Sequence, residues 1–189
     1  MTVKAQIWIL MPAAFLLLGD SSGSDFDRVV AALKAGQTAE AIGGSKQTVT
    51  LRIAAAMLIA AGARPAEGSE NLASRWQSAA TRADLAHGGA IAAYRNRALG
   101  PAYRTVNLPG GGRAVFEQVF LAGQRARVSV VPVSNSDFQL TINDDDKRRV
   151  CRNTQTGSNC EWVPLWTTRF SVNIANPGES SGTYYLIIQ

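Results

Sequence analysis

Beyond Pro101, apolar and polar residues alternate along the chain with a period of two, which is typical of half-buried β-strands. Phe138, Leu140 and Ile142 follow this pattern, because every second side chain of a strand points to the same face. The candidate strands are Tyr103–Leu108, Arg113–Leu121, Arg125–Val133, Asp137–Ile142, Arg148–Cys151, Thr167–Ala175 and Thr183–Gln189. Short strands joined by regular glycine- and proline-containing turns predict an antiparallel β-sandwich or barrel.

Residues 151–166, which lie before the last two candidate strands, include two cysteines and two tryptophans. Cys151 and Cys160 are the chain's only cysteines, and the Asn, Thr, Gly and Ser residues between them are typical of a turn. We predict a disulfide, which would stabilise the fold by roughly 2 to 3 kcal/mol; two separate buried thiols are the alternative. Trp162 and Trp166 flank Pro164 and are expected in or beside the core.

Upstream of the strands, apolar residues recur at spacings of three and four, the period of an amphipathic helix. The pattern runs from about Ser69, which could cap the helix, to Ala98, with an interruption at residues 87–89. Its apolar positions are Leu72, Trp76, Ala79, Ala80 and Ala83. We expect residues 64–102 to form a short α-helical segment that packs on the sandwich as a lid or leads to it as a stalk.

The first 63 residues contain two alternative export signals. An apolar run from Ile7 to Leu18 is shorter than the roughly 20 residues of a membrane-spanning helix, so it predicts a signal peptide of about residues 1–24 and no transmembrane span. A second apolar run follows Arg52 and ends in the A-x-A sequence of residues 61–63.

The second run would be a signal of about residues 49–63 if translation began near Val49. If the first run is the signal, residues 25–35 and 49–63 are ordinary Ala-rich helices. Both alternatives export the protein to the periplasm or the medium, and a pair of cysteines agrees with an oxidising compartment.

Composition limits the chain to one substantial domain, because it has 189 residues, of which 46% are hydrophobic. The net charge is +5, but the cations are dispersed. The run of residues 147–149 (Lys-Arg-Arg) directly follows three aspartates, so its charge is cancelled locally. We therefore expect a solvated surface and no nucleic-acid partner.

Three motifs in the β-region occur in a fixed order. They are the LAGQ turn of residues 121–124, a D-F-x-L-x-I strand at residues 137–142 followed by the acidic turn 144–146, and a closing G-x-Y-x-L strand at residues 182–186. This order resembles the bacterial pre-peptidase C-terminal domain family over residues 103–189. The resemblance implies a jelly-roll-like β-sandwich that is usually appended to a secreted enzyme and is itself non-catalytic. Here no peptidase is attached, which departs from the family's pattern.

Two groups of residues are candidate binding sites. Tyr94, Arg97, Tyr103 and Arg104 could stack on a sugar or contact a partner. They could equally be junction residues between helix and sandwich. Asp144, Asp145 and Asp146 could offer carboxylates to calcium, or could form a solvated turn. No other cofactor is predicted.

No arrangement of nucleophile, base and orienting partner is visible, so we do not predict an enzyme. The leading hypothesis is a non-catalytic binding or accessory module for a carbohydrate or protein partner. A structural subunit that pairs through its strand edges is a second hypothesis. A hydrolase would have to use strand-region acids such as Glu117, Asp137 and Glu161.

Overall fold

The computed structural model describes residues 24–43, 45–85, 100–133, 137–154 and 157–189, and within them three helices and nine strands. The helices are α1 (Asp25–Ile42), α2 (Ser45–Ala60) and α3 (Leu72–Leu85). The strands are β1 (Arg64–Pro65), β2 (Ala102–Leu108), β3 (Arg113–Phe120), β4 (Ala126–Pro132), β5 (Gln139–Asn143), β6 (Arg149–Asn153), β7 (Asn159–Trp162), β8 (Thr168–Ala175) and β9 (Gly182–Ile188).

The strands form two sheets that face each other, which confirms the predicted β-sandwich. One sheet has the order β1-β2-β9-β4-β7 and the other has the order β3-β8-β5-β6. All neighbours are antiparallel except β1, which pairs in parallel with the start of β2. The seven predicted strands correspond to β2–β6, β8 and β9, with ends that differ by one or two residues.

The sandwich core lies between the two sheets and contains the alternating residues of both. Val128 and Val130 of β4 face Phe170, Val172 and Ile174 of β8 within one buried cluster. The period of two determines which side chains face the core. If the register of a strand shifted by one residue, its apolar side chains would all point to the opposite face of the sheet.

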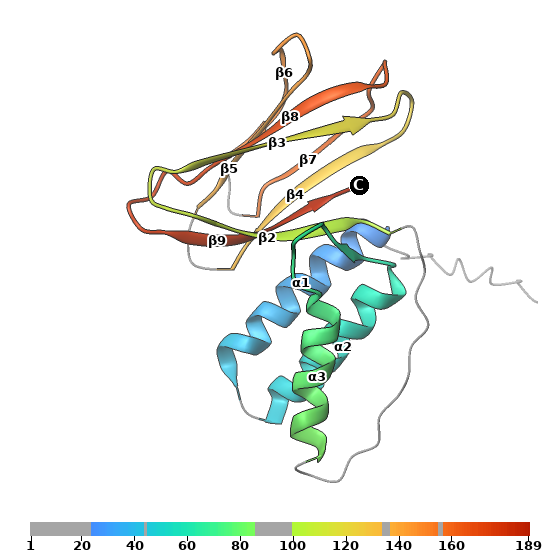
Figure 1. Cartoon of the computed structure of the whole chain (residues 1–189), viewed down its shortest axis with the longest axis vertical. Helices are drawn as coiled ribbons and strands as arrows, with labels where there is room; N and C mark the ends of the chain where they lie inside the picture. Colours follow the sequence, from blue (N-terminus) through green and yellow to red (C-terminus); the bar gives the residue numbers. More distant parts are fainter. Residues whose placement is uncertain (1–23, 44, 86–99, 134–136, 155–156) are drawn as a thin grey trace, which may run out of the picture.

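The three helices cover the outer face of the β1-β2-β9-β4-β7 sheet (Figure 1). That face is apolar, unlike a solvated outer face, and its side chains belong to the same buried cluster as the helices. They are Tyr103, Val131, Tyr185 and Ile187. These strands are therefore apolar on both faces, as expected for a sheet buried on both sides.

The helical layer begins further upstream than the predicted helical segment of residues 64–102. α2 includes most of the second candidate signal, and its Leu51, Ala54 and Leu58 side chains are fully buried or nearly so. α2 packs against both α1 and α3. Residue 63, the predicted end of the export-signal region, therefore lies between helices that pack together in one layer. Among the described residues, no helix is long and apolar enough to cross a bilayer.

α3 begins at Leu72, and Asn71 rather than Ser69 caps it, so the predicted cap was wrong. The Asn71 side-chain oxygen accepts a hydrogen bond from the backbone N–H of Ser74 at 3.1 Å. The backbone N–H of Leu72 donates to the Tyr103 hydroxyl of β2 at 3.0 Å. The start of the helix is therefore fixed by a side chain from the sheet.

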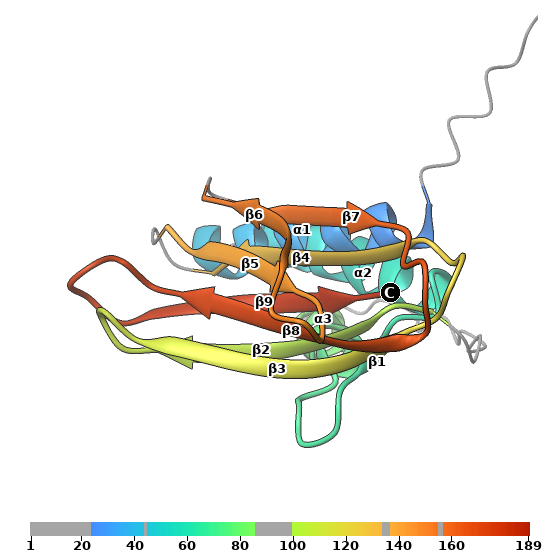
Figure 2. The ribbon, with the colours of Figure 1, turned by 90° about the horizontal axis from the view of Figure 1, so that it is seen from above.

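The two long edges of the sandwich differ. At one edge, β6 and β7 lie side by side (Figure 2), and the Cys151–Cys160 disulfide joins them with a Cα–Cα distance of 6.0 Å. This confirms the predicted bridge, which links the two sheets to each other. At the opposite edge, β2 and β3 are successive strands of different sheets that do not pair. The sandwich is open there.

Candidate functional site: a basic cleft between the two sheets

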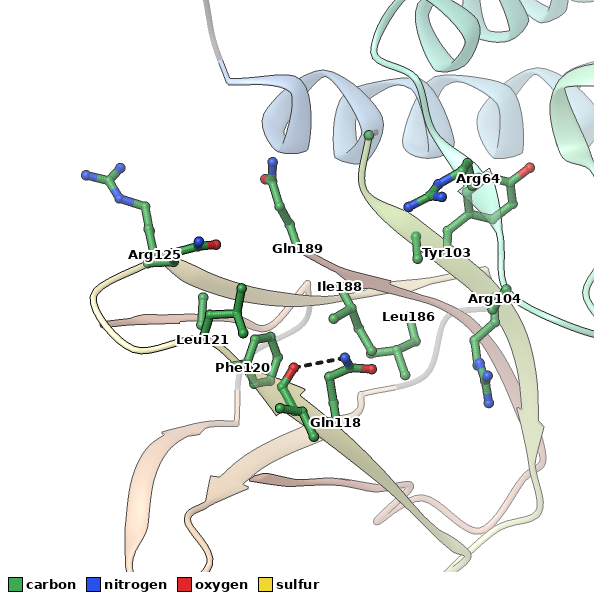
Figure 3. Close-up of a pocket in the computed structure, with 16 residues that line it drawn as sticks. Arg64, Tyr103, Arg104, Gln118, Phe120, Leu121, Arg125, Leu186, Ile188 and Gln189 are labelled. Atoms are coloured by element: carbon green, nitrogen blue, oxygen red, sulfur yellow. Dashed lines mark hydrogen bonds between the residues drawn. The ribbon is translucent and has the colours of Figure 1, made fainter. Parts of the chain in front are cut away.

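A cleft of about 330 Å³ lies on the open side of the sandwich, between β2, β9 and the ends of β3 and β4. Its volume is at the lower end of the range of small-ligand pockets. Leu186 and Ile188 of β9 point toward Phe120 and Gln118 of β3 across this space (Figure 3). The cleft is thus a continuation of the sandwich interior to the surface.

Apolar side chains form one part of the cleft and amides another. Leu186 is fully buried and Phe120 is 6% exposed, so both belong to the sandwich core as well as to the cleft. Gln118 is exposed at an inward-facing position of β3, between the core positions of Phe116 and Phe120. Its side-chain amide donates to the carbonyl of the next residue, Val119, at 3.1 Å.

Three arginines line the cleft, and none of its described lining residues has an acidic side chain. Arg125 pairs with Glu161 at 3.3 Å, but this carboxylate also accepts from Arg127 at 2.9 Å. Across the part of the chain that the structure describes, Arg64 and Arg104 form no ion pair. The cleft therefore carries an excess of positive charge.

Arg104 is held at the cleft by an aromatic ring from the other sheet. Its guanidinium carbon lies 5.0 Å from the ring centroid of Phe116, a cation–π distance. Arg104 occupies an inward-facing position of β2, because its neighbour Tyr103 faces the helices. The guanidinium of Arg104 has five N–H donors, and most of them are available to a ligand in the cleft. Their planar arrangement suits a carboxylate or another oxyanion as the acceptor.

A buried hydroxyl lies close to Arg104. Burial raises the pKa of Tyr184, and the positive charge of Arg104 opposes this increase. Among the described residues its hydroxyl has no hydrogen-bond partner, although the residue is fully buried. Tyr184 is therefore neutral at physiological pH, and it adds no nucleophile to the site.

Of the four predicted ligand-binding residues, the structure describes Tyr103 and Arg104. Arg104 lines the cleft, whereas Tyr103 is 1% exposed and its ring packs between the sheet and the helices. Burial raises the pKa of Tyr103. Its ring is not available for stacking on a sugar, and it serves the junction instead. Tyr94 and Arg97 lie outside the described residues.

Arg64, Gln118 and Arg125 are cleft residues that sequence reasoning did not identify. One signal could have found Gln118, because it is a polar residue at an inward position of an alternating strand, like Arg104. Arg64 comes from β1, whose two residues show no alternation. Only the tertiary fold brings Arg64 to the start of β2.

The three aspartates proposed for calcium each interact with a different group. Asp144 accepts from the backbone N–H of Arg148 at 2.8 Å, and Asp146 pairs with the Arg148 side chain at 3.2 Å. Asp145 accepts from the Thr168 hydroxyl at 3.5 Å. No group of three or more His, Cys, Asp or Glu residues suited to a metal ion occurs in the described ranges.

The acids considered for a hydrolase are dispersed. Glu117 accepts from Arg169 at 3.0 Å on the outer face of the β3-β8-β5-β6 sheet. Glu161 pairs with Arg125 and Arg127 on the other sheet. Neither they nor Asp137 line the cleft.

The two tryptophans differ in burial. Trp162 packs against Phe120 with ring centroids 4.8 Å apart, as expected for a core residue. Trp166 is 78% exposed and Leu165 is 83% exposed, so the prediction of a core position was wrong for Trp166. These two residues and the three aspartates line a second hollow of about 490 Å³ at one end of the sandwich.

No family model and no curated protein matches the sequence. Solved structures with a similar fold include a mitogen from Yersinia pseudotuberculosis, which is 16% identical over 47% of this chain and 84% of its own, with a TM-score of 0.42. The pre-peptidase C-terminal domain of a Bacillus anthracis collagenase is 13% identical over 46% and 87%, with a TM-score of 0.39.

A third similar structure is PliG from Aeromonas hydrophila, a periplasmic inhibitor of g-type lysozyme. It is 13% identical over 47% of this chain and 84% of its own, with a TM-score of 0.40. All three likenesses cover under half of the chain. At these identities and TM-scores they carry no functional argument. The pre-peptidase resemblance is thus supported only as a distant structural similarity.

Proposed function

We propose that this protein is a non-catalytic binding module that acts in the periplasm or outside the cell, where its basic cleft captures a carboxylate-bearing segment of a protein partner. The observation that carries the proposal is that, among the described residues, Arg64 and Arg104 have no counter-ion and the cleft has no acidic lining residue. Hydrogen bonds from arginine to a carboxylate are about twice as strong as neutral ones.

The apolar part of the cleft favours an amphipathic acidic ligand. Leu186, Ile188 and Phe120 give the cleft apolar walls beside the arginines. An aspartate or glutamate followed by an aliphatic side chain would satisfy both features, since the aliphatic group buries area while the carboxylate meets the guanidinium groups.

A protein partner is favoured over a polysaccharide. Sugar rings present flat CH faces for which an exposed aromatic ring is a suitable surface. In the cleft, Tyr103 and Phe120 are only 1% and 6% exposed, so neither ring face is open to a ligand. Arginine–carboxylate recognition needs no such face.

The chemistry of the lining supports binding without catalysis. Of the lining residues that the structure describes, none is a histidine, cysteine, serine, threonine, aspartate or glutamate. The one hydroxyl among them belongs to Tyr103, and it accepts from the Leu72 N–H. General acid–base and nucleophilic catalysis would each require a group that this lining lacks.

The location outside the cytoplasm rests on two features. The Cys151–Cys160 disulfide requires an oxidising compartment to persist. The apolar run from Ile7 to Leu18 has the length of a signal peptide's central region. Together they support the periplasm or the medium as the site of action.

The test uses fluorescence anisotropy with a fluorescein-labelled peptide of three Glu-Leu repeats. We expect the Arg64→Gln/Arg104→Gln double variant to bind this peptide at least about tenfold more weakly than the wild type, because each lost charge-assisted bond contributes about 1.5 to 3 kcal/mol. Binding should also weaken as sodium chloride is raised.

A matched control removes the same charge elsewhere. Arg149 and Arg152 are exposed on β6, at the opposite edge of the sandwich from the cleft, so the Arg149→Gln/Arg152→Gln variant should bind nearly as the wild type does. Equal weakening in both double variants would mean that only net charge attracts the peptide. Equal binding of a Gln-Leu repeat peptide would contradict carboxylate recognition.

A further inference from the structure

β3 is a long edge strand with one unpaired side. It has eight residues, all of which pair with β8, and β8 is its only neighbour in the sheet. The other side of β3 therefore presents backbone N–H and C=O groups that no strand of the described chain satisfies. Such an edge is suited to pairing with a strand of another molecule.

The other edges of the sandwich have features that limit such pairing. β1 has only two residues and includes Pro65, which has no N–H to donate. β6 and β7 are short, and the disulfide joins them. β3 contains no proline or lysine, and its outward side chains Val115 and Val119 are 60% and 50% exposed. Among the edge strands of the described residues, β3 therefore lacks the short length, the proline and the disulfide that limit pairing at the others.

We propose that β3 pairs antiparallel with β3 of a second copy of this chain, with Val115 of one copy opposite Val115 of the other. The two four-stranded sheets would then continue as one sheet across the two-fold axis. A two-fold interface requires a segment that is complementary to itself. The sequence RAVFE of residues 113–117 meets this requirement.

Charge selects this register. With Val115 opposite itself, Arg113 of each copy lies opposite Glu117 of the other, so two cross-strand ion pairs form by symmetry. In the described chain Arg113 forms no ion pair of its own, and Glu117 accepts from Arg169 at 3.0 Å. A register centred on Glu117 would place the two carboxylates opposite each other.

Side-chain size agrees with the same register. On the inward face, Ala114 of each copy would lie opposite Phe116 of the other, so the smallest side chain of the strand faces the ring. Phe116 is only partly buried in the single chain, because it lies at the open side of the sandwich under Arg104. Pairing would cover the outer edge of this ring. A register centred on Phe116 would instead set Val115 against Glu117.

The dimer should be reversible. One pair of strands buries less than the roughly 1,600 Å² of a standard interface, so we expect a dissociation constant on the order of micromolar or weaker. The residues of the paired segment end before Leu121 and Arg125. Gln118 and Val119, which line the basic cleft, lie within the paired segment.

Disulfide trapping tests the register directly. Two residues opposite each other in an antiparallel pair have Cα atoms about 4.5 to 5.5 Å apart, within the range that a disulfide spans. In protein exported with its native disulfide intact, the Val115→Cys variant should convert to a covalent dimer under mild copper-phenanthroline oxidation. Non-reducing electrophoresis measures the rate.

Val119→Cys is the matched control, because Val119 is on the same face of the same strand with similar exposure. In the proposed register it lies opposite residue 111 and should crosslink at least tenfold more slowly. Sedimentation velocity of the unmodified protein should show a concentration-dependent dimer that a Val115→Lys variant lacks. Equal crosslinking of the two cysteine variants, or a monomer at several hundred micromolar, would overturn the proposal.

Discussion

The guanidinium of Arg127 on β4 lies 4.7 Å from the ring centroid of Phe26 on α1, a cation–π contact that joins the helical layer to the sheet. Arg127 also pairs with Asp27 at 3.2 Å and donates to the Ser24 hydroxyl. Its side chain is 12% exposed. The N-terminal end of α1 is therefore held by β4, about a hundred residues further along the chain.

This junction should make stability depend on acid pH. The hydrogen bond with Ser24 is the largest influence that lowers the pKa of Asp27, and the charge of Arg127 lowers it further against the effect of burial. A carboxyl with a lowered folded-state pKa stabilises the fold above its unfolded pKa and loses this contribution as the pH falls through its folded pKa.

We therefore expect the wild type to be more stable than Asp27→Asn at pH 7 by less than about 1 kcal/mol, since Asp27 is half exposed. The difference should vanish in strong acid. Urea unfolding at a series of pH values measures it. Asp25→Asn, whose partner Arg28 is on the same helix, is the control and should show a smaller change. A deficit in Asp27→Asn that persists in strong acid would argue against this ion pair.

Gly36 on α1 should not tolerate a methyl group. A Cβ atom at this position would lie 2.6 Å from Cζ3 of the Trp76 ring, whose side chain is fully buried between the helices. Alanine favours a helix over glycine by about 1 kcal/mol. Overpacking should outweigh this gain, so we expect Gly36→Ala to lose about 1 to 3 kcal/mol of unfolding free energy.

Calorimetry or chemical unfolding measures the effect of Gly36→Ala. Gly36→Ala should cost less in a Trp76→Leu background than in the wild type, because the smaller side chain leaves room for the added methyl group. A Gly36→Ala protein more stable than the wild type would show that α1 and α3 do not pack in this way.

The exported protein should retain α1 and α2. Cleavage after residue 63 would remove both helices and expose Tyr185, Ile187 and other apolar side chains of the sheet. We expect intact-mass measurement of protein from the periplasm or medium to place the mature N-terminus before Asp25. A folded, soluble product that starts near Arg64 would instead support the second export signal.

Reduction of the disulfide should lower stability by about 2 to 3 kcal/mol, because the bridge closes a short loop and connects the edges of both sheets. Urea unfolding with and without dithiothreitol measures this difference. A Cys151→Ser/Cys160→Ser variant should be less stable by a similar amount and should not respond to the reductant. A response of that variant would point to an effect unrelated to the bridge.

The sequence predicted the sandwich because alternation is a local property. Phe170, Val172 and Ile174 show their common face without any tertiary information. β7 was missed because its four residues, Asn159–Trp162, are too few to establish a period and follow a turn-like stretch. β1 was missed because two residues that include a proline show no strand pattern.

The remaining differences depend on tertiary contacts. The Ala-rich sequence of α2 has the apolar character that a signal peptide and a buried helix share, and its packing against α1 and α3 could not be read from the sequence. The burial of Tyr103 depends on the helices that cover its face of the sheet. Likewise, Arg64 and Arg104 are forty residues apart, and parallel pairing of β1 with β2 brings both to the cleft.

Chemical-shift mapping with the Glu-Leu repeat peptide tests the central claim most directly. In ¹⁵N-labelled protein, titration should shift the backbone amides of Arg104, of Gln118 to Leu121 and of Ile188, which surround the cleft. The same titration of the Arg64→Gln/Arg104→Gln variant should leave these amides nearly unshifted. Shifts confined to the loop of Leu165 and Trp166, or to the helical layer, would contradict the account and place the binding surface elsewhere.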